Sequence, residues 1–102
     1  MMAKRASTSY STEEWEGFFW RLRVRQRLTV SVIAKRTQVA PQTASGRFKN
    51  IEARLIEAQS NNANAITDEA KTYGVSAEAA EEHFSKVAGY VHHAAPIMKE
   101  AA

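Results

Sequence analysis

Thr29–Gln59, TVSVIAKRTQVAPQTASGRFKNIEARLIEAQ, predicts two amphipathic helices joined by a tight turn. Thr29 suits the N-cap of the first helix, because its hydroxyl can accept from a backbone N–H that the first turn leaves unpaired. The inner face of this helix then follows at helical spacing and consists of Val30, Ile33, Ala34 and Thr37.

A turn at Gln38-Val39-Ala40-Pro41 separates the two helices. Pro41 suits the first position of the second helix, where its missing N–H has no cost. The second helix has one apolar stripe, formed by Ala44, Phe48, Ile51 and Leu55. Its opposite face is polar and carries Gln42, Ser45, Gly46 and Lys49, flanked by Thr43, Arg47 and Asn50.

These polar side chains are of the kinds that contact DNA. Gln and Asn can make two hydrogen bonds to a base edge, Ser and Thr one, and Arg and Lys reach guanine or phosphate. Two short helices that meet at a sharp turn present the second one outward, as major-groove recognition requires. Gly46 costs up to about 1 kcal/mol relative to Ala in a helix, and close approach to a backbone or a base is one reason for it.

Ile33–Phe48, IAKRTQVAPQTASGRF, resembles the helix-turn-helix core of phage-repressor-type and winged-helix bacterial regulators. Those families place Ala where Ala34 stands and an apolar residue where Val39 stands. They differ at Ala44, where a larger apolar residue is expected, and at Gln38, where Gly is usual. No alternating β-type residues follow Leu55 as a wing would need, so we expect an all-helical unit. A purely structural helical hairpin is the alternative interpretation.

The resemblance implies double-stranded DNA as the partner and assigns two groups of contacts. The residues expected at base edges are Gln42, Thr43, Ser45, Gly46 and Lys49. The residues expected at phosphates are Arg25, Arg27, Lys35, Arg36, Arg47 and Asn50. One helix-turn-helix buries little surface, so we expect a homodimer or a larger homo-oligomer.

A further helix is predicted from Ser11 to about Arg25, because Ser11 and Glu14 have the spacing of a capping box. We expect its apolar face to pack beneath the helix pair and to consist of Trp15, Phe18, Phe19 and Leu22, with Trp20 at the edge. An aromatic platform for single-stranded nucleic acid is the alternative. Arginines then recur at positions 21, 23, 25 and 27, and they suit either the helix dipole or phosphate contact.

Charge is divided between the two halves of the chain, whose net charge is +3. Residues 1–55 hold eleven Lys or Arg and four Asp or Glu, a balance of +7, whereas residues 56–102 hold three and seven, a balance of −4. A polyanion is therefore attracted to the first half, which contains the helix pair. Pairing of the two halves with each other in a fold or a dimer would also explain this division.

The second half repeats the first at an offset of 36 residues, which places Ala70–Phe84 on Ala34–Phe48. The matched pairs are Ala34 and Ala70, Lys35 and Lys71, Val39 and Val75, Ala44 and Ala80, and Phe48 and Phe84. Ile51 and Leu55 meet Val87 and Val91 at the same offset. We expect a turn at Gly74 and a last helix from Ser76 to about His93. Its outward face would repel phosphate and consists of Glu78, Glu81, Glu82 and Ser85. Common packing rules or an internal duplication both explain the similarity.

These observations predict an all-α small bundle of about five helices. We expect a flexible basic arm over 1–10, the DNA-binding region over 11–60, and an acidic helical region for oligomerisation or packing over 61–102. The chain has no cysteine, and its histidines lack zinc-type spacing. No catalytic motif, signal peptide or membrane segment is present. We therefore expect no enzyme activity, cofactor, metal, effector or membrane partner, and a cytoplasmic, nucleoid-associated location.

The expected function is that of a small transcriptional regulator, most simply a repressor, from a bacterium, phage or plasmid. One alternative is the DNA-recognition subunit of a phage packaging complex of the small-terminase kind. Another is a helical adaptor or inhibitor that acts by protein–protein contact and binds no DNA.

Overall fold

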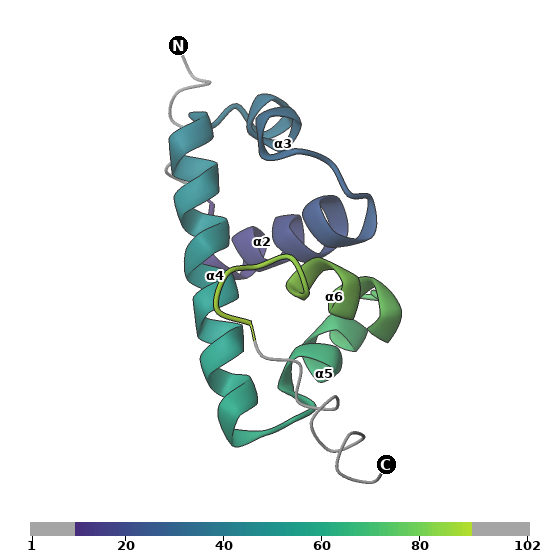
Figure 1. Ribbon diagram of the computed structural model, residues 1–102. Coiled ribbons are helices and arrows are strands. Elements are labelled where there is room, and N and C mark those ends of the chain that lie inside the picture. The colour runs from purple at the N-terminus through teal and green to yellow at the C-terminus, as the bar shows by residue number, and fades with distance from the viewer. Residues whose placement is uncertain (1–9, 91–102) are drawn as a thin grey trace, which may run out of the picture.

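The computed structural model describes residues 10–90, and within this range every element is helical (Figure 1). The elements are α2 (Thr12–Gly17), η1 (Phe18–Arg25), α3 (Val30–Thr37), α4 (Pro41–Asn61), α5 (Ala65–Thr72) and α6 (Ala77–Phe84). Because η1 continues α2 without a break, the prediction of an all-α bundle of about five helices is confirmed. No helix in the described range is long and apolar enough to cross a bilayer. The predicted basic arm lies outside the described residues, except for Tyr10.

The predicted helix starts are confirmed by hydrogen bonds at their N-caps. The Ser11 hydroxyl accepts from the backbone N–H of Glu14, and the Glu14 carboxylate accepts from that of Ser11, which completes the capping box. Thr29 accepts from the N–H of Val32 at 3.3 Å. Pro41 occupies the first turn of α4. These local contacts set where the helices begin.

The first helix changes from α-helical to π-helical winding after Gly17. The prediction that Trp20 lies at the edge of the helix is therefore wrong. Residues Phe18–Arg25 form a π-helix, in which backbone bonds span five residues instead of four. Side chains five residues apart therefore lie on the same side of this helix. The buried apolar residues of the first helix are Trp15, Phe19, Trp20 and Val24. Phe18 and Leu22, predicted on the apolar face, are only half-buried.

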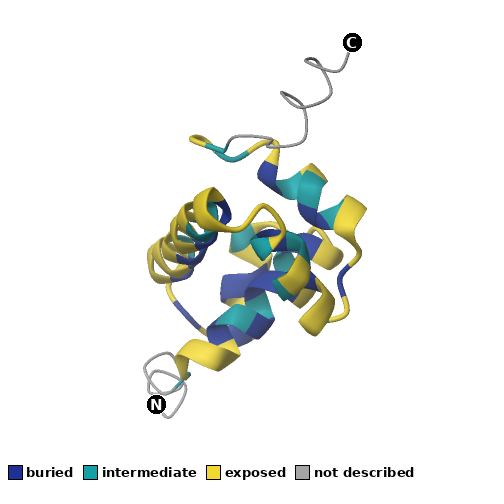
Figure 2. Ribbon diagram, turned by 90° about the horizontal axis from the view of Figure 1, so that it is seen from below, coloured by how far each residue is buried: buried dark blue, intermediate teal, exposed yellow. Residues whose placement is uncertain are grey.

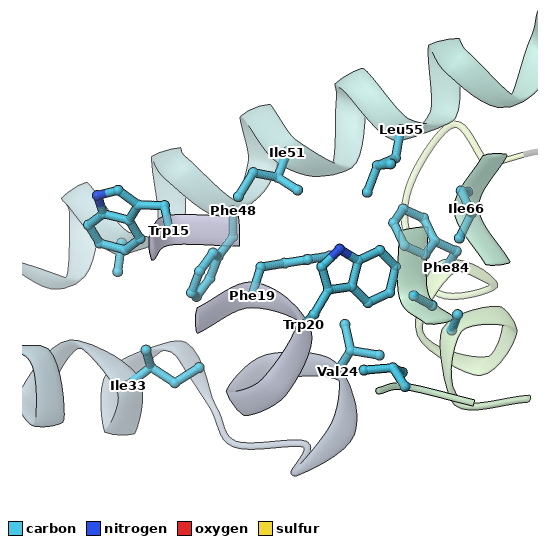
Figure 3. Packing of buried hydrophobic residues seen from close by; sticks show 14 of the residues in the cluster. Trp15, Phe19, Trp20, Val24, Ile33, Phe48, Ile51, Leu55, Ile66 and Phe84 are labelled. Carbon is cyan, nitrogen blue, oxygen red and sulfur yellow. The ribbon is translucent and has the colours of Figure 1, made fainter. Parts of the chain in front are cut away.

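Trp20 lies in the core rather than at the edge of the helix. Its side chain is fully buried, and its indole Nε1–H donates to the Glu69 carboxylate of α5 at 3.0 Å. Beside it, Phe19 lies between Phe48 of α4 and Phe84 of α6, with ring centroids 5.8 and 6.1 Å away (Figure 3). In the core, aromatic side chains of the first helix therefore contact aromatic side chains of both α4 and α6, which lie in the two halves of the chain.

The helix α4 is the longest element, and the other helices pack along one side of it (Figure 1). Its predicted apolar stripe is confirmed, since Ala44, Phe48, Ile51 and Leu55 are all buried. The outer side of α4 remains exposed along its length, as Figure 2 shows. The helix runs to Asn61, so that Asn62–Asn64 alone connect it to α5.

The two hairpins, α3–α4 and α5–α6, have turns of the same geometry. The turn residues Gln38 and Gly74 both have positive φ, 61° and 76°. The next residue donates back to the helix in both turns, from Val39 N to Ala34 O at 2.9 Å and from Val75 N to Ala70 O at 2.8 Å. Four apolar pairs at the 36-residue offset are buried: Ala34 and Ala70, Val39 and Val75, Ala44 and Ala80, and Phe48 and Phe84. Val87, paired with the buried Ile51, is only half-buried, and Val91, paired with Leu55, lies outside the described residues.

The correspondence ends where α6 stops, and the predicted extension of this helix to His93 is wrong. The helix ends at Phe84. Backbone bonds from Lys86 N to His83 O and from Val87 N to Phe84 O then span three residues, and Gly89 has a φ of 89°. This shorter bonding pattern and the positive φ turn the chain away from the helix axis.

Candidate nucleic-acid interface

The first three turns of α4 present the polar face that the sequence predicted. Of the five residues expected at base edges, four are exposed, namely Gln42, Thr43, Gly46 and Lys49. Ser45 is half-buried and lies toward the flank of the helix. Because the buried stripe holds α4 against the core on its opposite side, these side chains are held in fixed register and project together.

Gly46 leaves open space in the middle of this face. A Cβ built at this position would have no neighbour within 4 Å. Its φ is not in the left-handed region, so the turn geometry of the backbone does not require glycine here. No contact within the described residues explains the glycine.

The cations nearest this face have no carboxylate partners. Lys35 and Arg36 are exposed in the last turn of α3, and Arg47 and Lys49 are exposed on α4. None of these four makes an ion pair with a carboxylate of residues 10–90. The α3–α4 hairpin therefore carries positive charge that the fold does not neutralise.

Two of the predicted phosphate contacts lie elsewhere. Arg27 forms an ion pair with Glu82 of α6 at 2.6 Å, and its backbone is left-handed, with a φ of 60°. Arg25 is exposed, but its guanidinium lies close to Gly74 in the turn of the second hairpin. The structure therefore brings Arg25 and Arg27 to the α5–α6 hairpin, whereas the cations of α3 and α4 stay around the polar face of α4.

Arg47 and Asn50 lie on the flank of α4 that faces α2. The Arg47 guanidinium sits over the ring of Trp15, with its Cζ 5.9 Å from the ring centroid. Both residues line a small cavity of about 160 Å³, together with Trp15. A cation over an aromatic face is attracted by the ring quadrupole, and this contact orients Arg47 beside the polar face.

The carboxylates nearest α4 are held in contacts with other elements. Glu52 of α4 lies 2.7 Å from His83 of α6, and both side chains are largely buried. Glu16 of α2 pairs with Arg54 at 2.7 Å. These contacts hold the carboxylates of Glu16 and Glu52 away from the outer face of α4. Glu57, toward the C-terminal end of the same helix, is an exposed carboxylate.

Glu16 also accepts a hydrogen bond from Tyr73 of the second hairpin, at 3.2 Å. Burial, and then the nearby charge of Glu16, raise the pKa of the Tyr73 hydroxyl. The neutral phenol is the form that donates this bond, so the contact is made by the protonated hydroxyl. No group of three or more potential metal ligands occurs among the described side chains.

Several of these contacts join residues that sequence reasoning did not connect. His83 and Glu52 are 31 residues apart, Tyr73 and Glu16 are 57 apart, and Arg27 and Glu82 are 55 apart. The division of charge between the halves was the only signal in the sequence that pointed to such pairs, and it named no partners. Comparisons with protein-family models, with curated proteins and with solved structures found no match.

Proposed function

We propose that this protein binds double-stranded DNA by placing the first three turns of α4 in the major groove. The observation that carries the proposal is the exposed polar face of α4, which is bordered by four cations that have no carboxylate partner among residues 10–90: Lys35, Arg36, Arg47 and Lys49. Exposed lysines and arginines are common on protein surfaces. These four gather around one polar face, where a phosphate backbone would supply their counter-charge.

The dimensions of α4 suit this role. An α-helix with its side chains is about 10–12 Å wide, and the major groove is about 12 Å wide. The turn at Gln38 sets α3 across the start of α4, so α3 would lie near the DNA backbone while α4 enters the groove. Gln42, Thr43 and Lys49 would then face base edges, and Lys35 and Arg36 would face phosphates.

The second hairpin lacks these features even though its turn is the same. Glu78 and Glu82 are exposed on α6, and Glu82 holds Arg27. Negative charge at this surface repels phosphate, so α6 would not enter a groove. We therefore assign DNA contact to the first hairpin alone. We further propose that two such hairpins in a homodimer bind a specific DNA sequence, because this arrangement gives useful affinity.

Lys35 and Lys71 provide a matched pair of variants to test this assignment. Both are exposed lysines in the last turn of a short helix, and they occupy equivalent positions of the two hairpins. Lys35→Glu and Lys71→Glu change the net charge equally. Fluorescence anisotropy with a labelled duplex should show that Lys35→Glu weakens binding by roughly tenfold or more, while Lys71→Glu stays within about threefold of the wild type.

Equal weakening by the two variants would mean that only net charge matters and would contradict the assignment to the first hairpin. The wild type should also bind less tightly as salt rises, in proportion to the number of phosphates it contacts. Absence of binding at low salt by the folded protein would overturn the proposal. Selection of a preferred site from random duplexes then tests sequence specificity, which a transcriptional repressor requires. Light scattering tests the homodimer.

A further inference from the structure

Trp15 has an unused hydrogen-bond donor beside the proposed DNA face. The side chain is 3% exposed, and its Nε1–H has no acceptor in the structure. Trp20, the other tryptophan, donates its Nε1–H to Glu69. A buried N–H without an acceptor costs free energy, so such a group calls for an explanation outside the contacts of the free chain.

The surroundings of Trp15 are suited to an anion. The ring borders the cavity of about 160 Å³ between α2 and α4, which Arg47, Asn50, Arg54 and the hydroxyl-bearing Thr12 also line. In Figure 3 the indole nitrogen lies on the edge of the ring that faces away from Phe48. Arginine, amide and hydroxyl groups together are the usual protein donors to phosphate oxygens.

One carboxylate, that of Glu16, also lines this cavity. It is already held by Arg54 at 2.7 Å and by the Tyr73 hydroxyl at 3.2 Å. Arg54 is also shared with Glu69, whose carboxylate lies 3.2 Å away. Arg47 has no carboxylate partner among residues 10–90, so its guanidinium is the cation of the cavity that can meet an anion.

We propose that this cavity is a phosphate seat, in which one backbone phosphodiester of the bound duplex accepts from the Trp15 Nε1–H and from Arg47. The inference rests on the proposed function. A helix in the major groove has a phosphate backbone on each flank, and Arg47 and Asn50 lie on the flank of α4 next to α2. The Trp15 Nε1 atom is buried in the free chain, so we expect the Arg47 side chain, which lies over the ring, to shift when the phosphate binds.

In this phosphate seat Trp15 becomes one of the residues that contact DNA, although its burial alone would assign it only to the hydrophobic core. The seat also explains why the fold retains a buried donor without an acceptor. Asn50 and Thr12 are exposed at the mouth of the cavity and complete the donors around the second phosphate oxygen.

The indole N–H groups of the two tryptophans report this contact directly in a ¹⁵N–¹H correlation spectrum. On titration with duplex DNA, the Trp15 indole signal should shift while that of Trp20 stays near its starting position, and Trp15→Phe assigns the two signals. Trp15→Phe should weaken duplex binding by roughly tenfold, because it removes the donor and keeps most of the ring. Urea denaturation of the same variant checks that it remains folded, because Trp15→Phe leaves space in the core where the five-membered ring was.

The outcomes separate this inference from the proposed function. If the duplex shifts the backbone amides of α4 and leaves the Trp15 indole signal unmoved, the seat is wrong and DNA binding stands. If the duplex does not bind, both proposals fail. Titration with inorganic phosphate distinguishes the source of the anion. A Trp15 shift with free phosphate that is absent with duplex would overturn the assignment to the DNA backbone.

Discussion

Gln38 and Gly74 have the same left-handed backbone conformation, 36 residues apart in the chain. Gln38 is the C-cap of the eight-residue helix α3, and Gly74 follows Tyr73, the C-cap of the eight-residue helix α5. Glycine adopts this conformation without steric cost, whereas in any other residue the Cβ comes too close to the following carbonyl oxygen. The first hairpin therefore holds strain at Gln38 that the second avoids.

We expect Gln38→Gly to raise the free energy of unfolding by up to about 1 kcal/mol, because relief of strain is partly offset by the greater freedom of glycine in the unfolded chain. Gly74→Ala should lower it by about 1–2 kcal/mol. The space at Gly74 is not limiting, since the nearest atom to an added Cβ is 3.7 Å away. Urea denaturation of both variants measures the two effects, and a loss of stability in Gln38→Gly would contradict the account.

Gly46→Ala should have opposite effects on folding and on DNA binding. Because nothing lies within 4 Å of the added Cβ, the helix should gain up to about 1 kcal/mol from the better helix former. If the duplex approaches this position closely, binding should weaken by about fivefold or more. Denaturation and anisotropy on the same preparation measure both. Unchanged affinity in a stabilised variant would show that no partner approaches Gly46.

The winding of η1 makes a prediction about two neighbouring positions. Trp20→Ala should cost about 3–5 kcal/mol, because it removes a fully buried ring. Leu22→Ala should cost only about 1 kcal/mol, because Leu22 is half-buried. A regular α-helix would instead bury Leu22 on the face of Trp15 and Phe18. Equal costs in denaturation would argue against the π-helix.

The raised pKa of Tyr73 predicts a loss of stability in alkaline solution. Burial and Glu16 keep the phenol protonated in the folded chain above its ordinary pKa of 10.0. The stability from this group is therefore complete below pH 10 and is lost as pH rises through the folded pKa. Tyr73→Phe should show a smaller decline, and Tyr90, whose pKa is also raised by burial, should account for part of the remainder. Absorbance of tyrosinate in the folded wild type checks the direction.

Local signals in the sequence predicted much of this fold. The capping box at Ser11, the N-cap at Thr29 and the proline at the start of α4 each depend on a few adjacent residues, and each is confirmed. The buried stripe of α4 was predictable because its spacing is that of a regular helix. The burial of the paired residues at the 36-residue offset is confirmed up to Phe84.

Features that depend on distant contacts were not predictable in this way. The π-helix places Trp20 against Glu69 of α5, and only a contact across 49 residues could have revealed that position. The end of α6 at Phe84 was missed because its apolar pattern continues through Val87 and Tyr90, which are half-buried in turns rather than in a helix. The assignment of residues to DNA remains a prediction.

Phe19, held between Phe48 and Phe84, has a consequence for how the chain unfolds. Each hairpin supplies one wall around the same ring, so separation of either hairpin exposes the apolar surface on which the other rests. The two similar halves are therefore one cooperative unit rather than independent repeats. Loss of the α5–α6 hairpin would therefore melt α4 as well, the helix to which we assign DNA contact.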